Sequence, residues 1–269
     1  WGMGYNGKGE LGDGTTIDRN TPVPIATGVV EFSAGNQFSL FLKSDGGLWA
    51  TGNNSNGQLG DGTKDNRSFP VHVAADVVAV DAGSNNSLFI TSDGKLWAMG
   101  SNDNGKSLFS SSVDRTTPEM VQLGVSLISA GDHHTLFTKI DGTLWFIGSN
   151  TIGQAGIGTI EDVYVPIKMA DHVTGISAGS FRSHWIASGP PSLITITASP
   201  QSQTLLRGDD LMLTVSTDGE VPRFLQWRKD GEILPGQTGS NLEIPNLHLT
   251  DSGTFDVIVT SSVGSLTSD

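Results

Sequence analysis

Apolar and polar positions alternate in short runs along most of this 269-residue chain. The clearest run is FSLFLKSDGGLWATG at 38–52, where Leu40, Leu42 and Trp49 mark alternating segments on either side of Asp45-Gly46. Such alternation is typical of half-buried β-strands, and an Asp-Gly pair between two strands predicts a type I′ hairpin turn. Sustained helical periodicity with caps is absent from the sequence. The pattern therefore predicts an all-β protein.

The hairpin belongs to a unit that recurs at a constant spacing, without insertion or deletion. Similar hairpins occupy 87–100 (SLFITSDGKLWAMG) and 135–148 (TLFTKIDGTLWFIG). Equivalent positions repeat their residues in all four units: Trp1, Trp49, Trp97 and Trp145; Gly4, Gly52, Gly100 and Gly148; Asn6, Asn54, Asn102 and Asn150. A repeat of this length built only of strands is typical of a β-propeller blade. The predicted repeats are 1–48, 49–96, 97–144 and 145–188.

The repeated pattern resembles the repeats of the regulator of chromosome condensation family. It reads W-x-x-G-x-N-x-x-G-x-L-G-x-G, then proline, then (S/D)-A-G, then the hairpin. The third unit departs at KSLFSSS (106–112), and the fourth has Ala155 in place of leucine and loses its hairpin. The resemblance implies a propeller that usually closes with more blades than four units supply. We therefore expect a partial propeller, as a piece of a larger protein or an atypical array.

A Pro-Pro pair predicts a linker over 189–192, and a second pattern follows at 193–269. The segment LTDSGTFDVIV resembles the D-x-G-x-Y-x-C corner of immunoglobulin domains, with Phe255 in place of the tyrosine. The resemblance implies an immunoglobulin-like β-sandwich, of the cysteine-free kind in large bacterial surface and secreted proteins. Its last strand is expected to be truncated at Asp269.

The same resemblance assigns the core of this second domain. Trp227 follows Val215, which stands where the first cysteine of an immunoglobulin domain would be. Val257 stands at the place of the second cysteine. We therefore expect apolar packing of the two valines to replace the disulfide between the sheets.

Composition and charge narrow the possible partners. The chain has 28 Asp and Glu against 15 Lys and Arg, a net charge of −13, and both the repeat region and the second domain are acidic. This balance argues against nucleic-acid binding, which needs a basic surface. The chain has no cysteine, so disulfides and thiolate metal sites are excluded. Without an apolar run of membrane-spanning length, no membrane insertion is expected in this segment.

Two motifs resemble parts of ligand-binding sites, but the residues around them do not fit such sites. GKGELG, Gly7 to Gly12, matches G-x-G-x-x-G, but DGTTIDRNTPVP follows it instead of a helix, and the second copy, SNGQLG at 55–60, loses the first glycine. We interpret it as a loop connecting strands. GDGT at 12–15 and 60–63 suggests calcium, but no D-x-D-x-D-G loop is present.

Three further features invite a catalytic or ligand-binding interpretation. SDGK at 92–95 matches S-x-x-K of serine acylases but lies on a hairpin turn. The pair in DHH (132–134) is too small a set for zinc, and the resemblance implies that His134 packs and hydrogen-bonds between blades. The periodic tryptophans are expected to fill the blade cores. We predict no catalytic, cofactor-binding or metal-binding residues, no cofactor and no enzyme activity.

The paired domains imply a non-catalytic protein-interaction or adhesion module of a large, secreted or surface bacterial multidomain protein. The expected partner is another protein or a surface glycan, and the expected location is extracellular or at the cell surface. Two alternatives rest on the propeller resemblance. One is a guanine-nucleotide exchange factor-like regulator of a small GTPase, and the other is a propeller-type inhibitor of a secreted enzyme.

Overall fold

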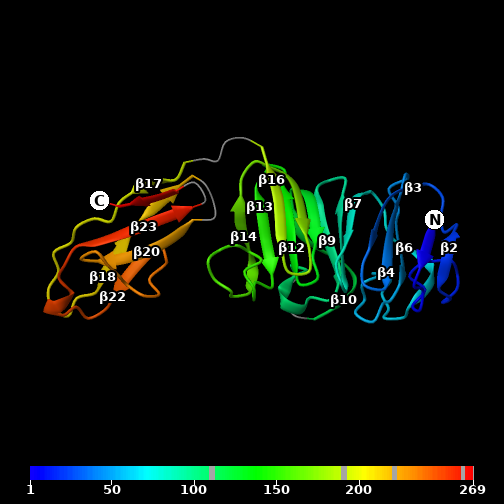
Figure 1. Ribbon diagram of the computed structural model, residues 1–269, viewed down its shortest axis with the longest axis horizontal. Helices are drawn as coiled ribbons and strands as arrows, with labels where there is room; N and C mark the ends of the chain where they lie inside the picture. Colours follow the sequence, from blue (N-terminus) through cyan, green and yellow to red (C-terminus); the bar gives the residue numbers. More distant parts are fainter. Residues whose placement is uncertain (109–112, 189–192, 220–222, 262–263, 269) are drawn as a thin grey trace. The chain divides into compact units, whose positions relative to one another are not determined.

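The computed structural model describes residues 1–108, 113–188, 193–219, 223–261 and 264–268 (Figure 1). The chain forms two compact units, Trp1–Ser188 and Gly189–Asp269. The predicted linker at 189–192 lies outside the described residues, as do residues 109–112 of the divergent KSLFSSS segment.

The first unit is a row of antiparallel sheets that follow one another in sequence order (Figure 1). Three sheets have four strands each: β3 (Val29–Ala34), β4 (Phe38–Lys43), β5 (Leu48–Gly52) and β6 (Arg67–Ala74); β7 (Val77–Ala82), β8 (Asn86–Thr91), β9 (Lys95–Gly100) and β10 (Arg115–Leu123); and β11 (Val125–Ala130), β12 (His134–Lys139), β13 (Leu144–Gly148) and β14 (Val163–Ala170). A two-stranded sheet stands at each end: β1 (Gly2–Gly4) with β2 (Arg19–Val23), and β15 (Val173–Ala178) with β16 (Ser183–Ala187). A short 3₁₀ helix, η1 (Asp103–Gly105), follows β9. The predicted all-β partial propeller is confirmed.

Each complete blade combines strands from two successive sequence repeats. In the first complete blade, β3 and β4 come from the repeat 1–48, and β5 and β6 come from the repeat 49–96. The innermost strands of neighbouring sheets, β3, β7, β11 and β15, contact one another in turn. The four repeats therefore yield three complete blades and two half-blades.

The middle strands of each blade supply its core. Leu48 and Ala50 of β5 are fully buried, whereas Trp49 between them is only half-buried because successive strand residues point to opposite faces. Trp97 and Trp145 are also half-buried. Trp97 and Trp145 pack against the hydrophobic clusters of the blades, so these tryptophans border the cores and do not fill them. Lysines cover two of the indole rings: Lys43 Nζ lies 4.4 Å from the ring centre of Trp49, and Lys139 Nζ lies 4.1 Å from that of Trp145.

The blade hairpins use a different turn from the predicted one. Gly46 has a φ of 80° and donates its N–H to Lys43 O at 3.0 Å, whereas Asp45 has no positive φ. This is a type I turn that ends on a left-handed glycine, not the type I′ turn that the Asp-Gly pair predicted. A type I′ turn occurs in the second unit, where both Asp230 (φ 51°) and Gly231 (φ 85°) are left-handed.

The second unit is a β-sandwich. Its largest sheet has the order β21 (Glu232–Ile233), β20 (Phe224–Lys229), β23 (Phe255–Ser261) and β24 (Gly264–Thr267). Two-stranded pairs complete it: β17 (Thr195–Ala198) with β19 (Ser216–Asp218), and β18 (Leu211–Thr214) with β22 (Asn241–Ile244). A 3₁₀ helix, η2 (Leu249–Asp251), precedes β23. Val215, Trp227 and Val257 are buried in one cluster, so the predicted replacement of a disulfide by apolar packing is confirmed.

Candidate interaction sites

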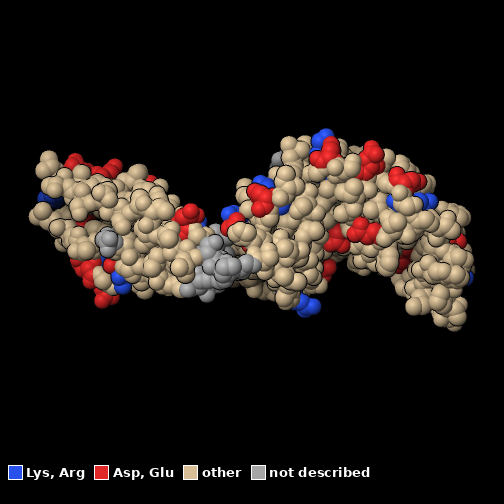
Figure 2. Space-filling view, turned by 90° about the horizontal axis from the view of Figure 1, so that it is seen from above, with Lys and Arg blue, Asp and Glu red and all other residues tan. Residues whose placement is uncertain are grey.

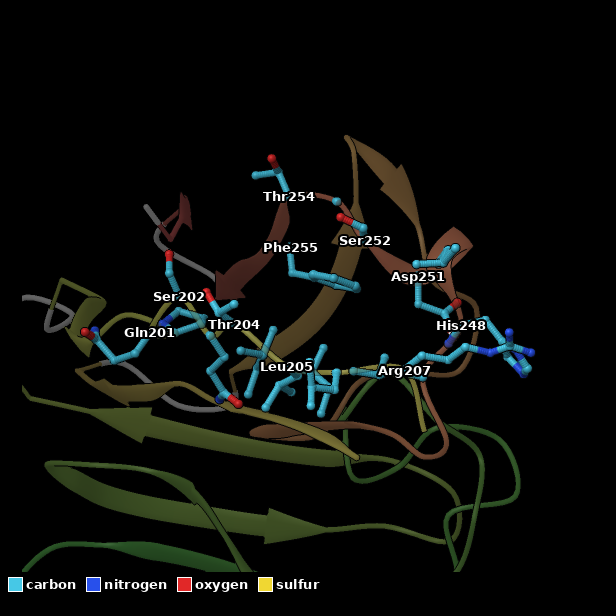
Figure 3. A pocket seen from close by; sticks show the side chains of 18 residues that line it. Gln201, Ser202, Thr204, Leu205, Arg207, His248, Asp251, Ser252, Thr254 and Phe255 are labelled. Atoms are coloured by element: carbon cyan, nitrogen blue, oxygen red, sulfur yellow. Dashed lines mark hydrogen bonds between the residues drawn. The ribbon is translucent and has the colours of Figure 1, made fainter. Parts of the chain in front are cut away.

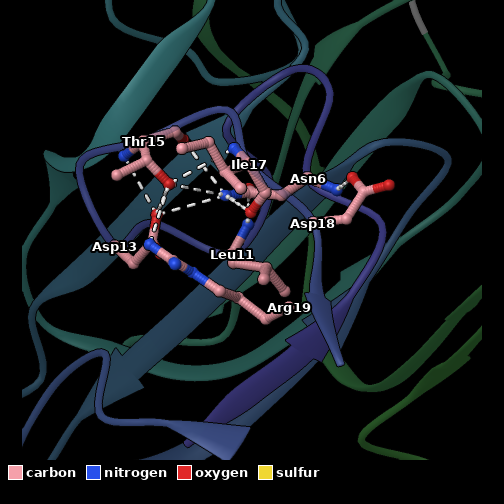
Figure 4. Close-up of polar contacts among 7 residues, drawn as sticks. All are labelled: Asn6, Leu11, Asp13, Thr15, Ile17, Asp18 and Arg19. Carbon is pink, nitrogen blue, oxygen red and sulfur yellow. Dashed lines mark hydrogen bonds and ion pairs between the residues drawn. The ribbon is translucent and has the colours of Figure 1, made fainter. Parts of the chain in front are cut away.

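The loop that contains GKGELG is organised by one buried side chain (Figure 4). The amide of Asn6 accepts a hydrogen bond from Leu11 N at 2.9 Å and donates to Asp13 Oδ1 at 3.1 Å and to Ile17 O at 3.2 Å. Arg19 Nε donates to the other carboxylate oxygen of Asp13 at 2.6 Å. The loop is thus closed by its own residues.

The same network recurs one repeat later. Asn54 accepts from Leu59 N at 3.0 Å and donates to Asp61 at 3.0 Å, and Arg67 donates to Asp61 at 2.6 Å. The carboxylates of the GDGT motifs are therefore occupied by arginine, threonine and asparagine side chains. Their hydrogen bonds explain the repetition of these residues without a pyrophosphate or a calcium ion.

Hydrogen bonds also hold the carboxyl group of Asp13 in its charged form. The hydroxyl of Thr15, with smaller contributions from Arg19 and Asn6, lowers the pKa of Asp13 to about 2. The carboxylate therefore carries its negative charge at neutral pH and remains paired with Arg19.

The DHH motif separates into two different environments. His134 is fully buried, stacks on Phe146 and has its Nε2 3.0 Å from Ser183 Oγ of the next sheet. His133 instead lies against Phe181. Burial, with a smaller contribution from His133, lowers the pKa of His134 to about 4. His134 is therefore neutral at pH 7 and holds two sheets together, as the family resemblance implied.

We expect the propeller unit to lose stability as the pH falls below 6.5. The unfolded chain takes up a proton on His134 near its ordinary pKa of 6.5, whereas the folded protein resists protonation down to about 4. This difference in pKa lowers the free energy of unfolding by about 3 kcal/mol as the pH falls from 6.5 to 4. Denaturant unfolding across that pH range measures it. His134→Asn should remove this dependence, because Asn86 fills the equivalent position in another blade; an unchanged slope in the variant would contradict the assignment.

Four repeated loops surround a cavity of about 390 Å³ where the innermost strands end. The loops are Ala-Gly-x segments at 34–36, 82–84, 130–132 and 178–180. A side chain on Gly83 would place its Cβ 2.8 Å from Gly131 O, so the glycines allow neighbouring sheets to approach closely. Small side chains and backbone make up most of this lining, which offers few groups to recognise a ligand.

A larger groove lies in the second unit, beside the segment 200–207 (Figure 3). Its volume is about 580 Å³. The apolar lining comprises leucines and one phenylalanine: Leu205, Leu206, Leu211, Leu213, Leu247, Leu249 and Phe255. Charged and polar groups also line it, among them Arg207, His248 and Asp251. Apolar and polar residues contribute about equally to the lining, and a concave surface of this kind can take up part of a ligand.

One edge of this groove is the start of β23, at Phe255. On β23, the backbone groups of Val257 face β24, since Ser268 N donates to Val257 O at 3.0 Å. Those of Thr254 face β20, since Asp230 N donates to Thr254 O at 2.7 Å. By alternation, the N–H and C=O of Phe255 point towards the β24 side. Within the described residues, the β23–β24 ladder does not reach Phe255.

Neither the charge nor the remaining side chains indicate another class of site. On the face shown in Figure 2, acidic side chains gather at several places and basic ones stand singly. Among the residues that the structure describes, no group of three or more His, Cys, Asp or Glu could hold a metal ion. No helix in the described part of the chain is long and apolar enough to cross a membrane.

Comparisons with known sequence families agree with the two-part organisation. Two families, each described as the regulator of chromosome condensation (RCC1) repeat, match the first unit, one at 1–42 and 45–90 and the other at 29–58 and 77–106. A family described as an immunoglobulin domain matches 190–261. Among curated proteins, no significant match is found.

Solved structures show the propeller fold. Prp20p from Saccharomyces cerevisiae, described with its binding properties to Gsp1p and histones, is 24% identical with a TM-score of 0.53, over 69% of this chain and 48% of that chain. Yeast RCC1 (Prp20) bound to Kap60 is 23% identical with a TM-score of 0.54, over 65% and 46%. Human WBSCR16 is 20% identical with a TM-score of 0.47, over 70% and 67%. The chain spans about half the length of the yeast proteins.

Proposed function

Because the chain carries regulator of chromosome condensation repeats followed by an immunoglobulin-like domain, we propose that it is a non-catalytic module that binds another protein. The observation that carries the proposal is the groove beside 200–207, which is lined by leucines and by the polar groups of Arg207, His248 and Asp251. A partner segment can place apolar side chains against the leucines and polar groups against these charged residues.

The sequence motifs that suggested chemistry support the same proposal, because each has a structural role. Asp13 holds Arg19 and Thr15, and His134 joins two sheets. The turn of the SDGK motif is closed by Gly94 N, which donates to Thr91 O at 2.8 Å. These residues therefore serve the propeller itself.

We expect Leu206→Asp to weaken peptide binding at least about tenfold. Leu206 is 77% exposed in the free protein, so the change spares the core, but it removes apolar contact worth more than about 1.4 kcal/mol from the groove. The probe is a synthetic peptide of alternating valine and threonine, followed by fluorescence anisotropy. Ile233→Asp, at an exposed position outside the groove, is the matched control. The proposal would be refuted if the wild-type protein did not bind the peptide, or if both variants lost the same affinity for it.

We also propose a secreted or cell-surface bacterial protein, because a cysteine-free immunoglobulin-like domain accompanies the repeats. Labelling of intact cells by an antibody against this segment tests the location. A surface glycan is the other expected partner, and binding of the chain to a glycan array that competes with the peptide would identify it.

Nucleotide exchange on a small GTPase is a second candidate, favoured by the fold likeness to Prp20p, whose structure is described with binding to Gsp1p. The likeness is in the first unit, so this activity would use the propeller and leave the groove free. Accelerated GDP release from a panel of small GTPases would support it, and Leu206→Asp should not affect that rate.

A further inference from the structure

The first residue of the second strand differs from sheet to sheet in the propeller unit. It is Phe38 in β4, Asn86 in β8 and His134 in β12, and all three side chains are buried. Each side chain lies beside the glycine three residues before it, because a Cβ built on that glycine would meet the side chain. The three residues therefore occupy the same place at successive contacts between neighbouring sheets. We call this place the junction slot.

The junction slot does not shrink where its side chain is small. A Cβ on Gly35 would lie 2.6 Å from Gly83 O of the next sheet, and a Cβ on Gly83 would lie 2.8 Å from Gly131 O. The sheets around Asn86 are therefore no closer together than those around Phe38. Since an amide is smaller than a phenyl ring, the slot leaves room beside Asn86 for about one or two water molecules, each of which takes up about 30 Å³.

The amide in this slot is buried without a protein partner in the part of the chain that the structure describes. Asn86 is fully buried, and neither its Oδ1 nor its Nδ2 has a hydrogen-bond partner among the described residues. Leaving such a group unpaired costs free energy, so a buried amide is normally bonded to protein or to an ordered water. The slot at Asn86 therefore combines the room and the polarity that a buried water requires.

The next junction indicates which group lies across the slot. The ring of His134 places its Nε2 3.0 Å from Ser183 Oγ of the next sheet. One repeat earlier, the residue equivalent to Ser183 is Thr135, which is fully buried and donates its hydroxyl hydrogen to Lys106 O at 2.6 Å. The oxygen of that hydroxyl can still accept a hydrogen bond. The side chain of Asn86 is shorter than that of His134, so a bridge to Thr135 needs one more atom.

We propose that a water molecule binds between Asn86 and Thr135. It donates one hydrogen to Thr135 Oγ1 and forms its other bond with the amide of Asn86. Such a bridge is nearly as favourable in enthalpy as a direct hydrogen bond. It joins two complete blades, as the imidazole of His134 joins the next two sheets. This site lies within the propeller unit and does not involve the groove of the second unit, so the two proposals can fail separately.

A crystal structure at a resolution that shows ordered water tests the position of this site. We expect a water oxygen about 2.7–3.2 Å both from the amide of Asn86 and from Thr135 Oγ1. A direct hydrogen bond between these two side chains would overturn the proposal. So would a slot in which the amide of Asn86 is bonded to another protein group and no water lies between the two residues.

Oxygen-17 relaxation dispersion counts long-lived internal waters and tests the site in solution. Asn86→His and Asn86→Phe give the slot the rings that His134 and Phe38 supply at the other junctions, so each variant should hold about one long-lived water fewer than the wild type. The matched control is Asn85→His, at a partly exposed neighbour where the next repeat has His133. The control should keep the wild-type count. Equal counts in all four proteins, or an equal loss in the control, would overturn the proposal.

Discussion

Trp227→Ala is expected to lower the unfolding free energy of the second unit by about 3–5 kcal/mol. The indole is fully buried among Leu213, Val215 and Val257. Its Nε1 donates to Gly239 O at 2.9 Å, so truncation leaves both a cavity and an unpaired carbonyl. A disulfide between the sheets would limit the damage in a typical immunoglobulin domain, and this chain has none.

Calorimetry of the whole chain measures this effect for each unit. The unfolding transition of the second unit should move to a lower temperature or disappear. The transition of the propeller unit should keep its temperature, because the tryptophan lies within the core of the second unit. Ile233→Ala, at a 60% exposed position of the same unit, should change stability by less than about 0.5 kcal/mol. Equal loss in both transitions would show that the units do not unfold independently.

Asn54→Ala should destabilise the first unit by about 2–5 kcal/mol, because each buried polar group left without a partner costs about 1–3 kcal/mol. The side chain is fully buried and makes four hydrogen bonds that hold the loop: it accepts from Leu59 N and donates to Asp61, to Thr63 O and to Thr63 Oγ1. The carboxylate of Asp61 retains Arg67, which limits the loss.

The matched control is Ser55→Ala, at the next position of the same loop and exposed. Denaturant unfolding followed at the propeller transition compares the two variants. The control should remain within about 0.5 kcal/mol of the wild type. If Asn54→Ala were as mild as the control, the repeated asparagines would need a reason other than the loop network, and a bound ligand would become the leading explanation.

The repeat, the strand content and the second domain could be predicted from the sequence because short stretches of residues indicate each of them. The constant spacing from Trp1 to Trp49 and onwards, with the alternation around Asp45-Gly46, suffices for the propeller. The turn type was wrong because the choice between type I and type I′ depends on the left-handed state of Asp45, which the dipeptide alone does not set. The contact of Trp97 and Trp145 with the blade cores follows from the constant spacing, but their partial exposure does not, because spacing does not show which face of the strand is buried.

The pairing of β4 with β5 across the boundary between two repeats could be predicted from the Asp-Gly hairpin at 38–52. The groove could not be predicted from local patterns. The groove depends on how the segment 200–207 lies against residues 247–255, which are far away in the sequence. Asn6 and its equivalents could have been singled out from the sequence, since a buried amide repeated in every unit signals a loop anchor.

The claim that partner binding resides in the groove is tested most directly by residue-resolved hydrogen exchange, with and without the alternating valine–threonine peptide. The peptide should slow exchange at the backbone amides of Leu205, Leu206 and Phe255, which line the groove, and leave the propeller loops unchanged. Unchanged exchange at these three amides, or protection confined to the propeller loops, would contradict the account.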